Sequence, residues 1–598
     1  MKKARFWLVL VLLLGIAVPA SAAEPYANYN FNKGFVSQEP QAYTLQKVLD
    51  SYTIGIESLD NIPFKNPSDF VISREDGTVV LSDTGNNRVI VMNRDFQVLQ
   101  IIGNQSAGFT QNEETGETVA GEAKYFPAEN AKVYPIPLNG VQKKSEAFES
   151  FNMPSGVFFS GDGNLYVCDT KNRRVVRFFR NEEGQYVCDA IFNDPDIARY
   201  VNGVSGTSEN PAGEETGEET GEETGEETGE ETGEETGENT GENTGENTGE
   251  NTTPGSQDEK FTYEPKAVVV DEGNRMYVVV DGCYQGLVEL SSDGSFTKFV
   301  GATKTTATIS ALWRRIISQK QREALAASLS TEYTNAYLDA DGMIFGTVGN
   351  IKTDVLASHF STKSEIGAAI KRIAPTGTDI LKRNDVYPPS GDRGYDTSMR
   401  ERWSFFVDIC VADDGIYSAL DRNKGRIFTY NPEGELLYIF GAMGNVNGAF
   451  TQPVALDLLD QSTIGVLDSQ TAQITIFELT DFGSKIRNAT LLQTDRFYDE
   501  AMSLWQEVLS ESSNSRLAYT NIARIQYIRG EYEDCCENYA RAFNQSGYAE
   551  AYAKMRNERL EVLMPYVMTG LVIIILFFVG KGAFKRMREF IKKKGRSN

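Results

Sequence analysis

Residues 66–92 read NPSDFVISREDGTVVLSDTGNNRVIVM, and elements of this stretch return several times along the chain. It contains three short apolar runs separated by polar turns, the first at Asp76-Gly77 and the second from Thr84 to Asn87. Asp83 closes the second run. Three short strands cannot bury both faces of a sheet alone, so the pattern predicts a unit that stacks against copies of itself.

Five further copies follow the first. The second is the most complete, and its Thr170, Asn172 and Arg173 are the counterparts of Thr84, Asn86 and Arg88. The other copies lie at Pro265 to Asp281, Asp339 to Phe345, Asp408 to Arg426 and Pro453 to Phe477. The unit resembles the NHL repeat, whose signature is P-x-G, a DG turn, Y-V-x-D, T-x-N-x-R and an apolar strand. The resemblance implies a mainly β fold, a six-bladed β-propeller over residues 63–480.

The sixth copy ends after only three strands. The N-terminal segment, residues 23–62, contains one predicted strand, Thr44 to Leu49. We expect this strand to complete the sixth blade and close the ring, because closure removes the exposed edges of the outermost sheets.

Both ends of the chain indicate export to a membrane surface. Residues 1–22 have the cationic start, apolar stretch and small-residue cleavage site of a secretory signal peptide. Residues 561–580 are predicted to form a transmembrane helix: Leu563 to Val579 is apolar apart from Pro565 and Thr569, and with Leu560 to Val562 the stretch reaches the roughly 20 residues that such a helix needs. Eight cations and one acid follow in residues 581–598. The positive-inside rule therefore predicts a single-pass membrane protein with its bulk extracellular and its tail cytoplasmic.

The formal net charge of −26 comes mostly from one linker. Residues 213–252 consist of GEET and GENT tetrads with 16 glutamates and no cation, which leaves the rest of the chain nearer −10. Without apolar residues, the linker (residues 203–260) is predicted to be a disordered, solvated spacer, although such an acidic tract could also bind cations. A second insert, residues 104–151, is expected on the same rim. No external basic stripe indicates nucleic acid as a partner.

A helical pattern interrupts the propeller after the third copy. Residues 309–330 carry apolar side chains at helical spacing and are predicted to form an inserted helix that covers the rim, or a partner-docking element. The segment from Trp313 to Thr331 resembles the inserted helix of a group of exported NHL-propeller proteins from Gram-positive anaerobes. That resemblance implies exported or membrane proteins as partners, including components of ABC-type transporters.

A second repeat system occupies residues 483–560. Tyr498, Ala501, Trp505 and Val508 recur 34 residues later as Tyr532, Cys535, Tyr539 and Ala542. This is the tetratricopeptide period, and the stretch resembles that repeat, which implies a short α-helical solenoid. Recognition through such a solenoid makes its aromatic side chains candidates for partner binding; they are Trp505, Tyr519, Tyr527 and Tyr539.

The residues that chemistry would need are scarce. His359 is the one histidine in the chain, so a two-histidine metal site cannot form, and its polar neighbours predict a surface or loop position. A recurrent aspartate closes the second strand of every copy except the fourth and is expected to accept backbone N–H groups, or, as the alternative, to hold a metal as in gluconolactonase. These metal candidates are Asp83, Asp169, Asp281, Asp421 and Asp468. The arginines Arg88, Arg173 and Arg426 are expected to be structural, and the six cysteines free and mostly buried.

These observations favour binding over catalysis. We predict an extracytoplasmic, membrane-anchored scaffold without a cofactor, with a gluconolactonase-like metal-dependent hydrolase or lyase as the rival. A carbohydrate-binding receptor is the third reading, with stacking by loop tyrosines such as Tyr284, Tyr333 and Tyr395. Each reading needs a different arrangement: convergent acidic ligands at one channel end for the enzyme, an aromatic pocket for the receptor, and exposed patches for the scaffold.

Overall fold

The structure is a computed structural model of the chain. It describes residues 27–30, 35–56, 62–103, 107–111, 118–123, 127–134, 150–197, 201, 261–302, 332–349, 351, 353–392 and 403–595. The predicted signal peptide, the tetrad linker and the inserted helix at residues 309–330 lie outside the described residues.

Six sheets of mainly antiparallel strands form the blades. The first contains β4 (Asp69–Ile72), β5 (Val79–Asp83), β6 (Arg88–Met92) and β7 (Val98–Gly103). The second contains β11 (Pro154–Phe159), β12 (Leu165–Asp169), β13 (Arg174–Arg180) and β14 (Tyr186–Asn193). The third contains β15 (Pro265–Val270), β16 (Met276–Val280), β17 (Leu287–Leu290) and β18 (Phe296–Val300).

The remaining blades follow the same order. The fourth contains β19 (Glu332–Leu338), β20 (Ile344–Gly349) and β21 (Ile370–Ile373). The fifth contains β22 (Phe406–Val411), β23 (Tyr417–Asp421), β24 (Arg426–Tyr430) and β25 (Leu436–Phe440). The sixth contains β26 (Pro453–Asp460), β27 (Thr463–Asp468) and β28 (Gln473–Leu479), joined by β3 (Tyr43–Leu49).

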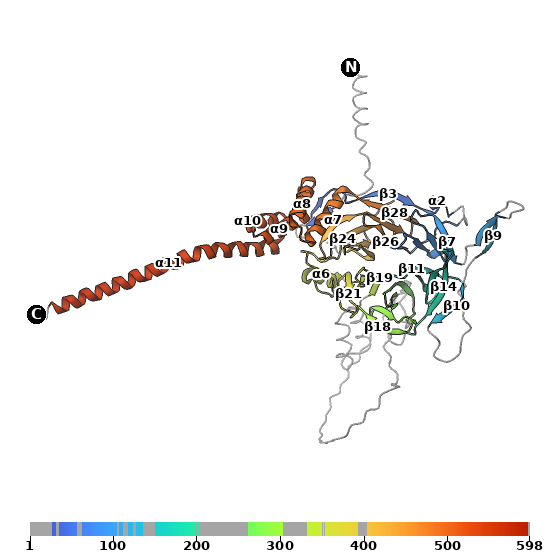
Figure 1. The fold of residues 1–598 in the computed structure, drawn as a ribbon, viewed down its shortest axis with the longest axis horizontal. Helices are drawn as coiled ribbons and strands as arrows, with labels where there is room; N and C mark the ends of the chain where they lie inside the picture. Colours follow the sequence, from blue (N-terminus) through green and yellow to red (C-terminus); the bar gives the residue numbers. More distant parts are fainter. Residues whose placement is uncertain are drawn as a thin grey trace, which may run out of the picture. The chain divides into compact units, whose positions relative to one another are not determined.

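The first strands of the blades form the inner ring. Contacts run from β4 through β11, β15, β19, β22 and β26 and back to β4, so the ring is closed and the prediction of a six-bladed propeller is confirmed. The N-terminal strand β3 pairs antiparallel with β28, with Leu49 opposite Ile474 and Tyr43 opposite Leu479. Figure 1 shows this blue strand beside the orange end of the propeller. The sixth blade therefore joins both ends of the propeller sequence.

Two blades depart from the four-stranded pattern. In the second, β10 (Pro127–Tyr134) pairs in parallel with β14 as a fifth strand, so part of the insert at residues 104–151 belongs to a blade. The hairpin of β8 (Ala107–Gln111) and β9 (Thr118–Ala123) precedes it, and a second hairpin, of β1 (Ala27–Asn30) and β2 (Phe35–Gln38), lies near the N-terminus. In the fourth, helix α6 (Thr353–Thr362) separates β20 from β21. The sequence patterns predicted neither β10 nor α6.

The C-terminal region is helical. Its helices are α7 (Asp481–Thr494), α8 (Tyr498–Glu511), α9 (Arg516–Arg529), α10 (Tyr532–Arg541) and α11 (Gln545–Lys594). Another short helix, α2 (Ser51–Ile54), lies near the N-terminus, directly after β3. Successive C-terminal helices pack on one another from α7 to α11. Gly530 ends α9 in the left-handed conformation, at φ 79°, which a glycine adopts without a steric penalty.

The helices share a hydrophobic core with the propeller. One cluster of buried side chains includes Ile427 and Tyr438 of the fifth blade together with Ile486 of α7 and Trp505 of α8. Three ion pairs cross the same boundary: Arg487 with Asp414, Arg516 with Asp385, and Arg524 with Glu435. Thr480, which caps α7, also donates from its hydroxyl to the carbonyl of Ala42 at 3.0 Å. The helical region is therefore packed against the propeller.

Helix α11 is long enough and apolar enough to cross a membrane, the one such helix among the described residues. Its first part packs on α10 through the buried Ala551, whereas the large apolar side chains between Leu560 and Val579 are exposed. Figure 1 shows α11 as one long helix at the C-terminal end of the chain.

Candidate functional site

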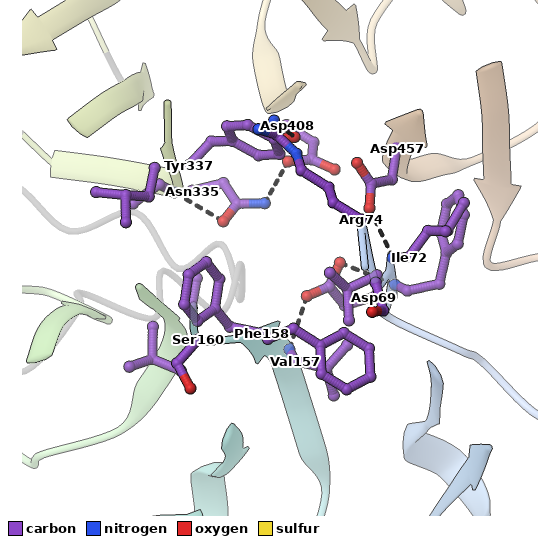
Figure 2. A pocket seen from close by; sticks show the side chains of 18 of the residues that line it. Asp69, Ile72, Arg74, Val157, Phe158, Ser160, Asn335, Tyr337, Asp408 and Asp457 are labelled. Atoms are coloured by element: carbon purple, nitrogen blue, oxygen red, sulfur yellow. Dashed lines mark hydrogen bonds between the residues drawn. The ribbon is translucent and has the colours of Figure 1, made fainter. Parts of the chain in front are cut away.

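A cavity of about 270 Å³ lies in the centre of the propeller. Its walls come from the first strand of every blade, and from the turns after β4, β11 and β19. The polar groups that surround it in Figure 2 are Asp69 of β4, Asn335 of β19, Asp408 of β22 and Asp457 of β26. Phe158 and Tyr337 add aromatic surface. The propeller therefore has a small central chamber that is acidic on several sides.

The carboxylates of this chamber hold neighbouring blades together. Asp69 accepts the N–H of Val157 in the second blade at 2.9 Å. Asp408 accepts the N–H of Leu456 in the sixth blade at 2.7 Å, and Asp457 accepts the N–H of Ile72 in the first blade at 2.7 Å. Each of the three also accepts the N–H of the residue that follows it. Every carboxylate oxygen of this set therefore bears a backbone hydrogen bond.

The amide of Asn335 continues the same network. Its side-chain nitrogen donates to Asp408 at 2.5 Å, and its oxygen accepts the N–H of Ala336 at 2.7 Å. Asp69, Asp408 and Asp457 each accept a backbone N–H of a neighbouring blade, and Asn335 donates to Asp408 of the next blade. These four side chains therefore join blades in a polar interior.

Arg74 extends from the first blade across the chamber. Its guanidinium donates to the Tyr337 hydroxyl at 2.7 Å and to the Val411 carbonyl at 2.7 Å, and it pairs with Asp413 at 3.0 Å. Figure 2 shows its side chain passing between Asp457 and Tyr337. One end of the chamber is therefore bridged by a cation held between the first, fourth and fifth blades.

Burial weakens the acidity of these carboxyl groups. Burial, together with the nearby charge of Asp457, raises the pKa of Asp69 to about 7. Burial also raises the pKa of Asp457 to about 6, although Arg74 opposes the shift. The pKa of Asp408 is raised well above its usual value by burial and by the charge of Asp69. Near neutral pH the chamber therefore holds carboxyl groups that can take up protons.

The aspartates predicted from the repeat lie elsewhere, at the ends of the second strands. Asp83 accepts the N–H of Lys65 at 2.8 Å and the Arg88 guanidinium at 2.6 Å. Asp169 accepts the N–H of Asn152 at 2.7 Å and the Arg174 guanidinium at 2.8 Å. Burial raises the pKa of Asp83 and of Asp169. Both act as anchors between a strand and the loop that precedes the blade.

The other members of that set vary. Asp421 accepts the N–H groups of Phe405 and Asn423, and Asp468 those of Thr451, Gln452, Gln470 and Thr471. Asp281 is half-exposed and pairs with Lys266 at 2.7 Å. Among the residues that the structure describes, no three acidic, histidine or cysteine side chains converge as metal ligands.

The assignment of Arg173 to the repeat position is wrong. Arg173 is exposed and adopts the left-handed conformation at φ 56°, whereas Arg174 occupies the place of Arg88 and pairs with the buried Asp169. The spacing of T-x-N-x-R, counted from Thr170 and Asn172, already selects Arg174, and the strand register agrees, because Arg174 lies opposite Asp169 as Arg88 lies opposite Asp83. Arg426 pairs with Asp392 at 3.1 Å.

The prediction that His359 lies on the surface or in a loop is also wrong. His359 lies in helix α6 and is 1% exposed. Its Nδ1 is 2.5 Å from the Ser364 carbonyl, while burial lowers its pKa to about 4. The polar residues around it in the sequence face outward on a helix that sequence patterns did not predict.

Two of the predicted partner-binding aromatics are unavailable to a partner. Trp505 and Tyr539 are buried, because the 34-residue period repeats core positions and not surface positions. Trp505 donates from Nε1 to Gln493 at 2.9 Å. Tyr519 and Tyr527 are partly exposed.

The tyrosines expected to stack on a ligand are dispersed. Tyr284 is exposed on the third blade, whereas Tyr333 is buried and donates to the Gly301 carbonyl at 2.8 Å. Tyr395 lies outside the described residues. The aromatic side chains of the chamber, Phe158 and Tyr337, were not predicted, and neither was its acidic set. A signal for that set exists in the sequence, since Asp69 and Asp408 occupy the same place in their repeats.

The sequence profile of the NHL repeat matches residues 151–178, which contain the first two strands of the second blade and most of the third. This chain carries an NHL repeat. A search of curated protein sequences finds no match to the NHL-repeat chain.

Solved structures similar to the NHL-repeat chain include two enzymes. A catalytically inactive virginiamycin B lyase from Staphylococcus aureus with quinupristin is 10% identical, with a TM-score of 0.33, over 73% of this chain and 100% of that chain. A gluconolactonase from Xanthomonas campestris is 10% identical, with a TM-score of 0.33, over 78% of this chain and 99% of that chain. Likeness at this level carries no argument about the activity of the NHL-repeat chain.

Proposed function

We propose that this protein is an extracytoplasmic binding scaffold, anchored in the membrane by α11, that holds exported or membrane proteins such as components of an ABC-type transporter. The observation that carries the proposal is the buried joint between Arg487 of α7 and Asp414 of the fifth blade, at 2.5 Å. Arg487 also donates to the Gln461 carbonyl of the sixth blade at 2.7 Å. A propeller fixed in this way to helices is suited to present its rim at a constant height above a bilayer.

The proposed topology follows from charge. The cations after the apolar part of α11 favour a cytoplasmic tail, and the propeller then lies outside. Both propellers and helical repeats commonly serve recognition, but neither fold specifies the partner. The exposed Met443 and Val446, in the loop between the fifth and sixth blades, offer apolar surface on the rim.

Photo-crosslinking in intact cells tests the proposal. A photoreactive amino acid replaces Val446 in one full-length chain and the exposed Tyr52 in another, and crosslinked partners are identified by mass spectrometry. The scaffold reading expects one defined exported or transporter protein from one of the two positions. Capture of no defined partner from either position, together with turnover of a small molecule by the purified chain, would overturn it.

A metal-dependent hydrolase or lyase is the second candidate. The chamber favours it, because Asp69, Asp408 and Asp457 are acidic groups gathered around a cavity of about 270 Å³. Each of their oxygens bears a backbone hydrogen bond, and Arg74 brings a positive charge among them, which opposes a second cation. Calorimetric titration of the full chain in detergent with Ca²⁺ separates the two: stoichiometric binding that Asp69→Asn abolishes would favour the enzyme.

A further inference from the structure

The turn end of the helical region consists of the loop between α7 and α8 and the loop between α9 and α10. It carries two exposed apolar side chains. Phe497, which precedes α8, is 54% exposed, and Ile528, in the last turn of α9, is 57% exposed. An ion pair between Arg529 and Asp499 joins the end of α9 to the first turn of α8, so the two loops lie together.

Contacts with helix α11 show how far the turn end lies from the apolar part of that helix. Arg559 of α11 pairs with Glu533, in the first turn of α10, at 3.3 Å. The Tyr527 hydroxyl of α9 donates to Glu550 of α11 at 2.9 Å. The turn end therefore lies beside α11 between Glu550 and Arg559, and the exposed apolar part of α11 begins at the next residue, Leu560.

The distances involved are small. Ten residues separate Glu550 from Leu560, which is about 15 Å of helix at a rise of about 1.5 Å per residue. Each headgroup layer of a bilayer is about 5 to 8 Å thick, from the difference between its total and hydrocarbon thickness. If Leu560 begins the membrane span, the loop between α9 and α10, which Arg559 holds through Glu533 one residue before Leu560, reaches this layer. Ile528 lies beside that loop, and the Arg529–Asp499 pair brings Phe497 next to it.

We infer that the turn end of the helical region rests on the bilayer that α11 enters, with Phe497 and Ile528 in the headgroup layer. This inference depends on the anchoring part of the proposed function. Apolar side chains gain from partial burial at that depth. Of the acidic residues in the first turns of α8 and α10, Asp499 and Glu533 pair with arginines, and Glu500 and Asp534 lie beside them. Such a contact would restrain the tilt of the helices, and with them the propeller.

The opposite end of the helical region supplies a matched control. Phe543, between α10 and α11, is 45% exposed, but it precedes Arg559 by about 24 Å of helix. It is therefore apolar and accessible like Ile528, yet too far from the bilayer to touch it. Leu571, in the middle of the apolar part of α11, reports on the membrane span itself.

The test places one fluorescent thiol label at a time on the full chain in phosphatidylcholine vesicles, using Ile528→Cys, Phe497→Cys, Phe543→Cys and Leu571→Cys. All six native cysteines are buried, and the unsubstituted chain gives the background. A lipid with a nitroxide near its headgroup, and another with one in its acyl chain, act as quenchers. We expect loss of fluorescence at 528 and 497 with the shallow quencher, at 571 with the deep quencher, and none at 543.

Two other results overturn the inference in distinguishable ways. Quenching at 571 with none at 528 or 497 would leave the anchor intact and free these side chains for a protein partner. Absence of quenching at 571 would remove the membrane span, and the anchoring part of the proposed function with it.

Discussion

Arg487 of α7 pairs with Asp414 in the turn between the first two strands of the fifth blade, at 2.5 Å and almost out of contact with water. The residue before Asp414, Asp413, pairs with Arg74, which bridges the central chamber. Two consecutive carboxylates in one turn thus hold the helical region on one side and the lining of the chamber on the other.

Loss of Arg487 should therefore weaken the whole fold. Arg487→Met leaves the Asp414 carboxylate without its partner in a mostly buried place, and we expect a loss of about 3 kcal/mol in the free energy of unfolding. The control is Arg94→Met, because the Arg94–Asp460 pair is exposed on both sides and should contribute at most about 0.5 kcal/mol. Denaturant unfolding of the full chains in detergent measures both. Equal losses of stability in Arg487→Met and Arg94→Met would contradict a stabilising role for the Arg487–Asp414 pair.

The adjacent arginines of the second blade should behave differently. Arg174→Met removes the partner of the buried Asp169, and we expect a loss of about 2 to 3 kcal/mol. Arg173→Gly should be neutral or stabilise by up to about 1 kcal/mol, because a glycine relieves the left-handed conformation there. Thermal unfolding checks the pair, and a larger effect at Arg173 would show that the register of β13 is wrong.

The 34-residue repeat should be a packing repeat. Trp505→Ala removes a fully buried side chain of the shared core, so we expect a loss of about 3 to 5 kcal/mol. Phe497→Ala, eight positions earlier and exposed, should leave the free energy of unfolding in detergent nearly unchanged. A large effect of Phe497→Ala there would mean that it packs against protein.

The contribution of Asp69 to the free energy of unfolding should increase as pH falls, which is the opposite of what an aspartate with a lowered pKa would give. An aspartate whose pKa rises from about 4 in the unfolded chain to about 7 in the folded one binds protons more tightly when folded. Its contribution to stability is then greatest below about pH 4 and falls as pH rises towards about 7. Asp69→Asn cannot titrate, so wild type should gain stability relative to this variant as pH falls from 7 to 5. A difference independent of pH would contradict the shift.

The propeller could be predicted because its repeat has local signals: turn glycines, alternating apolar residues and a closing aspartate. The missing strand of the sixth copy indicated a closing strand from elsewhere, and β3 provides it. The shared repeat position of Asp69 and Asp408 indicates a common role, but no local pattern joins them to Asp457, because the three meet only after six separate strands close into a ring.

Other features depend on tertiary contacts that leave no local trace. Helix α6 buries His359 within a polar sequence, and Arg487 finds Asp414 across 73 residues of chain. Trp505 and Tyr539, 34 residues apart, lie in α8 and α10, but periodicity alone does not distinguish a core face from a binding face. The burial of Trp505 and Tyr539 assigns both to the core face.

The central claim is that the propeller is held rigidly by helices that lead into the membrane. Spin labels at Tyr284→Cys on the third blade and Tyr548→Cys on α11, both exposed positions, measure it directly in the full chain. Electron paramagnetic resonance should give one narrow distribution of distances between the labels. A broad distribution would contradict the claim, because it would mean that the propeller swings freely on its anchor.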